Sequence, residues 1–243
     1  MSWKFLSFHF KQSFDGGYRY LDQCGEFMVR AQQEYNFIPS EAKPSGAKLE
    51  LPEQGVLLFA DTVAIGLTQE LNPDSDSFGE ICVASSTLAR EIFQPISVTR
   101  NGFAVKLRRD FSTEAALESA LQQMVNEPHR KLAKIVGMAP NHRNLDYWFS
   151  AGSRQLHLTL NVSSLKRSGP PQMRPSPIAP RLEKDRFARK ERYYETYREE
   201  LYYALVVEAD LLEDNPAIDA NLLEHFAEAR RIAEIAKEQL MLS

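Results

Sequence analysis

The sequence predicts an α+β protein whose N-terminal half follows the ferredoxin-like order β-α-β-β-α-β, with two helices covering one face of an antiparallel sheet. Two observations predict this class. Apolar residues alternate with polar ones along 4–14 and recur at helical spacing after residue 18, and turn-forming Gly, Pro, Asn and Asp residues separate the segments. With 43% hydrophobic residues among 243, the chain can bury a core of its own.

The alternating segment 4–14 is predicted to be the first strand. Asp15-Gly16-Gly17 then supplies a turn, because glycine tolerates backbone angles that other residues avoid. A helix follows and ends before Pro39. Its apolar face is predicted to consist of Tyr20, Leu21, Cys24, Phe27, Met28 and Ala31.

The remainder of the first half is predicted to form a hairpin, a second helix and a last strand. Asn72-Pro73-Asp74 offers capping side chains for that helix, and Gln94-Pro95 closes it. The other expected elements are a loop over 40–46, a short strand over 48–51, a turn over 52–55, one long strand over 56–67 and a strand over 96–107.

The second half is less regular and begins with a helix at Ser112-Thr113-Glu114, where a hydroxyl cap precedes an acidic first turn. Its apolar stripe is Leu117, Leu121 and Met124. Further expected elements are strands over 132–138, 155–162 and 201–212, a helix over 183–200, and a long amphipathic helix over 216–241. We therefore divide the chain into a ferredoxin-like unit, 1–110, and a second α+β unit, 111–243, with a Pro-rich basic connection at 166–185.

Composition excludes several classes of protein. No apolar run approaches the roughly 20 residues of a membrane span, and the N-terminus lacks the apolar stretch of a signal peptide. We therefore expect a soluble, cytoplasmic protein with no membrane partner. Cys24 and Cys82 cannot supply a disulfide framework or a four-ligand zinc site, so both are expected to be reduced thiols. We expect no cofactor.

Two groups of residues carry a partial catalytic pattern. His157-Leu158-Thr159 resembles half of a phosphoesterase signature that needs two His-x-Thr/Ser strands, but His9 is followed by Phe10 and Lys11 and lacks the hydroxyl partner. Glu208 and Asp210 lie two apart on a predicted strand, and Asp61 lies in another. They could hold a divalent cation, although a solvated strand face explains the same pattern.

The clearest signal is a basic segment in an acidic chain. Residues 166–198 contain ten Lys or Arg against four Asp or Glu, a net charge of +6, whereas the whole chain carries −4. Tyrosines are interleaved with these charges, a mixture typical of protein interfaces and of nucleic-acid contacts. The predicted partner-binding residues are Arg181, Arg186, Arg189, Lys190, Arg192, Tyr193, Tyr194 and Tyr197.

The sequence therefore favours a non-enzymatic recognition protein, such as an accessory subunit, that binds another protein or associates with itself. A nucleic-acid-binding protein using 166–198 is the first alternative, although a pI of 5.8 is low for a dedicated nucleic-acid domain. The second alternative is a metal-dependent enzyme acting on phosphate groups, with its acidic residues on the 201–212 strand.

Overall fold

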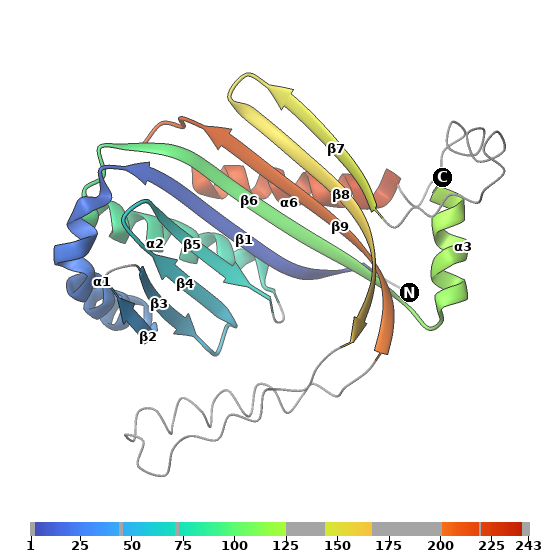
Figure 1. Cartoon of the computed structure of the whole chain (residues 1–243), viewed down its shortest axis with the longest axis horizontal. Helices are drawn as coiled ribbons and strands as arrows, with labels where there is room; N and C mark the ends of the chain where they lie inside the picture. The colour runs from blue at the N-terminus through green and yellow to red at the C-terminus, as the bar shows by residue number, and fades with distance from the viewer. Residues whose placement is uncertain are drawn as a thin grey trace, which may run out of the picture.

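A computed structural model describes residues 3–43, 46–70, 73–124, 144–166, 201–218 and 220–239. Within these ranges nine strands form one sheet, in the order β2-β3-β4-β5-β1-β6-β9-β8-β7 (Figure 1). Neighbouring strands pair antiparallel throughout. The strands are β1 (Trp3–Asp15), β2 (Ile38–Lys43), β3 (Gly46–Leu51), β4 (Val56–Ala60), β5 (Ala64–Gln69), β6 (Ser97–Phe111), β7 (Asn144–Ala151), β8 (Arg154–Lys166) and β9 (Leu201–Asp214).

The described helices are a 3-10 turn η1 (Gly17–Arg19) and the α-helices α1 (Tyr20–Tyr35), α2 (Ser75–Phe93), α3 (Glu114–Met124) and α6 (Leu222–Gln239). Two of the predicted starts are confirmed by their caps. The Asp74 side chain accepts a hydrogen bond from the Asp76 amide, and Thr113 Oγ1 accepts one from the Ala116 amide. None of the described helices is long and apolar enough to cross a membrane.

Helices α2 and α6 lie over one face of the sheet (Figure 1), which we call the covered face. Because successive strand residues point to opposite faces, alternate residues of β1 and β6 are directed to this side. Phe8 and Phe103 are fully buried there, and their ring centroids lie 5.2 and 5.4 Å from that of Phe226 in α6. These aromatic contacts form the centre of the core.

The predicted α+β class is confirmed as a large antiparallel sheet with helices, but the specific ferredoxin-like arrangement is not, because the sheet has nine strands. Strand β2 covers 38–43, so its second part falls where a loop over 40–46 was expected. The expected strand over 56–67 is two strands, because Asp61 Oδ1 accepts the amides of Val63 and Ala64 and reverses the chain between β4 and β5.

Three other predictions need correction. Strand β7 was not expected, and it precedes the predicted strand over 155–162. The C-terminal helix begins at Leu222 rather than 216, because β9 runs to Asp214 and the Asn221 side chain caps the first turn. Leu21 points to solvent, since it falls outside the face of α1 that buries Tyr20 and Phe27.

The strands of both halves join in one sheet through the pairing of β6 with β9, while the division into units 1–110 and 111–243 stays a prediction. The predicted strand over 132–138 and helix over 183–200 lie outside the described residues. Both cysteines are free, as expected. Burial raises the pKa of the Cys82 thiol.

Candidate functional site

The partner-binding residues predicted from the sequence all lie outside the described part of the chain: Arg181, Arg186, Arg189, Lys190, Arg192, Tyr193, Tyr194 and Tyr197. Their role stays a prediction. The site that the structure does describe is formed by the β7–β8 hairpin and by the polar residues that lie beside it on the sheet.

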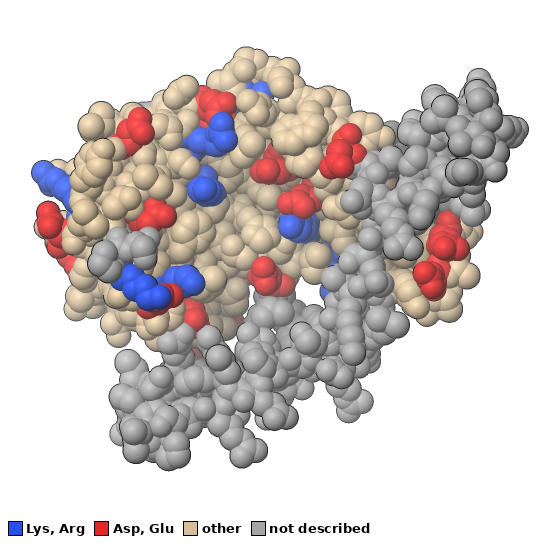
Figure 2. All heavy atoms as spheres, in the orientation of Figure 1, with Lys and Arg blue, Asp and Glu red and all other residues tan. Residues whose placement is uncertain are grey.

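The face of the sheet opposite α2 and α6 carries polar side chains, and we call it the polar face. The strand registers align two rows across β1, β6, β9, β8 and β7. One row is His9, Ala104, Asp210, His157 and Trp148, and the next is Ser7, Lys106, Glu208, Thr159 and Asp146. Charged side chains of both signs are visible on this face in Figure 2.

His157 of β8 is held by two residues of β7. Its Nε2 donates a hydrogen bond to Asp146 Oδ1 at 3.1 Å, and its ring stacks on the indole of Trp148 with centroids 3.9 Å apart and planes 9° apart. Both partners come from the strand that pairs with β8, so the hairpin itself creates the arrangement. The imidazole fixes the plane in which Trp148 is presented.

The two histidines considered for phosphate chemistry do not meet. They share a row, but β6 and β9 lie between their strands, which puts their backbones about 14 Å apart. His9 lacks the hydroxyl of the signature, since Lys11 stands at that position, but two other hydroxyl groups lie beside its ring. Ser7 Oγ lies 2.9 Å from its Nε2 and Thr68 Oγ1 lies 3.2 Å from its Nδ1. A cross-strand neighbour such as Thr68 has no signature in the sequence around His9.

Of the three acidic residues of the metal hypothesis, Glu208 and Asp210 share one face of β9, whereas Asp61 lies apart from them at the β4–β5 turn. Asp61 is occupied in the turn between β4 and β5, and Glu208 Oε2 lies 3.3 Å from Lys106 Nζ. Burial and the charge of Glu208 raise the pKa of Asp210. Among the described residues, no three His, Cys, Asp or Glu side chains are grouped so that they could hold a metal ion.

Strand β7 forms one edge of the described sheet and exposes three consecutive aromatic residues. Tyr147, Trp148 and Phe149 are 43%, 64% and 52% exposed. Trp148 lies on the polar face, and the rings of Tyr147 and Phe149 stack on the other face with centroids 6.5 Å apart. Large apolar side chains that cluster on a surface typically mark an interaction site.

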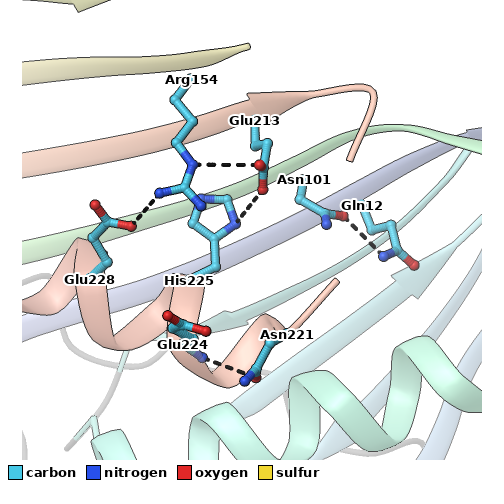
Figure 3. Close-up of polar contacts among 8 residues, drawn as sticks. All are labelled: Gln12, Asn101, Arg154, Glu213, Asn221, Glu224, His225 and Glu228. Atoms are coloured by element: carbon cyan, nitrogen blue, oxygen red, sulfur yellow. Dashed lines mark hydrogen bonds and ion pairs between the residues drawn. The ribbon is translucent and has the colours of Figure 1, made fainter. Parts of the chain in front are cut away.

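A polar network on the covered face anchors this hairpin to the body (Figure 3). Arg154, the first residue of β8, donates to Glu213 of β9 at 3.5 Å and to Glu228 of α6 at 2.9 Å. Buried His225 lies beside this network, with Nδ1 3.9 Å from Glu213 Oε2, and neither ring nitrogen makes a hydrogen bond. The network ties the turn of the hairpin to both layers of the fold.

Sequence reasoning missed this site although a signal was present. Gly152-Ser153 separates an aromatic segment, 147–149, from the alternating segment 155–162, which is the pattern of a two-residue hairpin turn. Gly152 has the positive φ (61°) that such a turn requires. Comparison with known proteins adds no functional information, because no family model matches the chain and no curated protein is significantly similar to it.

Proposed function

We propose that this chain is a recognition protein that binds another protein along the exposed edge of β7. The observation that carries the proposal is the run of three exposed aromatic residues on an edge strand. An edge strand offers backbone N–H and C=O groups to an incoming strand, and aromatic side chains are enriched in the cores of protein interfaces.

The opposite edge of the sheet supports this choice by contrast. Strand β2 contains Pro39, Glu41 and Lys43, and its register with β3 is interrupted between Pro39 and Glu41. Proline, exposed charges and irregular pairing are features that keep edge strands from pairing with other chains. Strand β7 has an uninterrupted register, contains no proline or lysine, and its single charged residue, Asp146, is hydrogen-bonded to His157.

Charge favours a protein over a nucleic acid as the partner of this edge. Asp146 lies two residues from Trp148 on the same face of β7, and Asp210 lies in the row of Trp148 two strands away. Carboxylates repel phosphate groups. The basic segment 166–198 would form a second contact with a protein partner. This contact stays a prediction.

Site-specific photo-crosslinking in the cells that make the protein tests the proposal. A photoreactive residue replaces Ser150, which is exposed on β7, and in a matched control it replaces Val29, which is exposed on α1. We expect the first chain to form a discrete crosslinked protein product, and the control to form none of the same mass. Replacing Tyr147 and Phe149 by serine should abolish the product.

A crosslink that is absent at position 150, or that survives the two serine substitutions, contradicts the proposal. Recovery of nucleic acid instead of protein from the crosslink at position 150 would favour a nucleic-acid-binding protein.

A further inference from the structure

We infer that the partner of the β7 edge is a second copy of this chain, bound through antiparallel pairing of β7 with β7 around a two-fold axis at Trp148. The inference rests on the proposed recognition function and names its partner. Three properties of β7 support it: the direction of its backbone groups, the match of its side chains with themselves, and the area that pairing would bury.

The backbone direction follows from the hairpin. Ala151 pairs with Arg154 around a two-residue turn, and in such hairpins the pair that closes the turn is hydrogen-bonded. Hydrogen-bonded and non-hydrogen-bonded positions then alternate along the strand. Phe149 and Tyr147 therefore bond to β8, whereas the N–H and C=O groups of Ser150, Trp148 and Asp146 point away from the sheet. No strand of the described residues pairs with these three, so within that part of the chain they are available to a new strand.

The side chains of β7 complement themselves when Trp148 lies opposite Trp148 of the second copy. Direct neighbours in an antiparallel pair share a face, so Tyr147 of each chain then lies opposite Phe149 of the other. Asp146 lies opposite Ser150, which avoids placing two carboxylates together. Each indole keeps its stack on His157 and gains a second aromatic neighbour on the open side.

The buried area predicts a weak dimer. From the exposed fractions of the three aromatic residues, six rings contribute about 640 Å² if a whole aromatic side chain offers about 200 Å² and all of the exposed area is buried. Backbone and flanking residues bring the total towards the lower limit of about 1,200 Å² for specific interfaces. We therefore expect a reversible dimer that forms at roughly micromolar concentrations.

Sedimentation velocity of the full chain across the micromolar range tests the stoichiometry. The wild-type chain should shift from monomer to dimer with concentration. Trp148→Lys and Trp148→Glu should each stay monomeric, because like charges would face each other across the axis. An equimolar mixture of the two variants should dimerise again. The matched control is Tyr18→Lys, at an exposed aromatic residue near α1, and it should dimerise like the wild type.

Amide hydrogen exchange on the wild-type chain tests the register without any substitution. When the protein concentration is raised, the amides of Asp146, Trp148 and Ser150 should become protected from exchange. The amides of Tyr147 and Phe149 should change little, because they are already hydrogen-bonded to β8. A chain that stays monomeric throughout, a mixture that fails to dimerise beside a dimeric wild type, or a dimer without this alternating protection overturns the inference.

The outcome also separates this inference from the proposed function. If position 150 crosslinks to a different protein and the wild-type chain is monomeric, recognition through β7 stands and self-pairing is wrong. If position 150 crosslinks to nothing and no dimer forms, both are wrong.

Discussion

The two faces of the sheet differ in what their side chains contact, although the same strands supply both. On the covered face, Phe8 and Phe103 are fully buried against Phe226 of α6. On the polar face, the neighbouring residues His9 and Lys106 are only half-buried and make polar contacts. The side chains of the covered face therefore stabilise the fold, whereas those of the polar face are not needed for the core and can contact other molecules.

The largest expected effect is on the covered face. Phe8→Ala should lower the free energy of unfolding by about 3–5 kcal/mol, because it removes a fully buried ring and leaves a cavity among three other aromatic rings. The adjacent residue on the polar face is the matched control. His9→Ala should cost only about 1 kcal/mol, the typical contribution of its hydrogen bonds. Urea unfolding of both variants measures the difference, and equal losses would contradict the contrast between the faces.

A smaller effect concerns acidification. His225 is buried against the covered face, and His9 is half-buried on the polar face. Burial lowers the pKa of His225, and burial together with Lys106 lowers that of His9. The unfolded chain therefore binds these protons more tightly than the folded chain does. The stability that depends on the neutral imidazoles is fully present above about pH 6.5 and is lost as the pH falls through the folded-state values.

Urea unfolding between about pH 7.5 and about pH 5 should show this loss of stability. His225→Phe should reduce the loss, because the ring that cannot titrate keeps the contact with Phe103. The raised pKa of Asp210 acts in the opposite direction, since the folded chain holds that proton more tightly as the pH falls through the raised value. Asp210→Asn should therefore deepen the loss at acidic pH. If His225→Phe lost stability on acidification as the wild type does, the titration of His225 would not be the cause of the loss.

The smallest effect concerns the charges of the polar face. Lys106→Met should change the free energy of unfolding by less than about 1 kcal/mol, because its ion pair with Glu208 is partly exposed. Lys106 lowers the pKa of both His9 and Asp210, so the substitution should raise both values. NMR titration of the two side chains checks this prediction. Unchanged pKa values would show that the charge of Lys106 does not act on His9 and Asp210.

Local patterns in the sequence predicted much of the fold. The alternation along 4–14, the caps at Asp74 and Thr113, and the C-terminal amphipathic helix all correspond to elements of the structure. The prediction was wrong where a turn had no Gly or Pro to mark it, as at Asp61 between β4 and β5. It was also wrong at β2, because proline and charged residues are disfavoured in most strands but tolerated at a sheet edge.

The candidate site was less predictable than the fold. The sequence singled out His157, Glu208 and Asp210, and the structure places them on one face beside Lys106 and Trp148. No feature of the sequence near His157 indicates that Asp210, 53 positions later, lies opposite it. Which strand lies at the edge is likewise decided by pairings between segments far apart in the chain.

The sequence by itself determined which residues of each segment share a face, because strand and helix periodicity act over a few neighbouring positions. Only the tertiary structure decided which strands are neighbours, and therefore that three consecutive aromatic residues lie on an edge strand of the described sheet rather than inside it. The reason is that strand order minimises the free energy of the whole core, to which Phe8, Phe103 and Phe226 contribute from three distant segments.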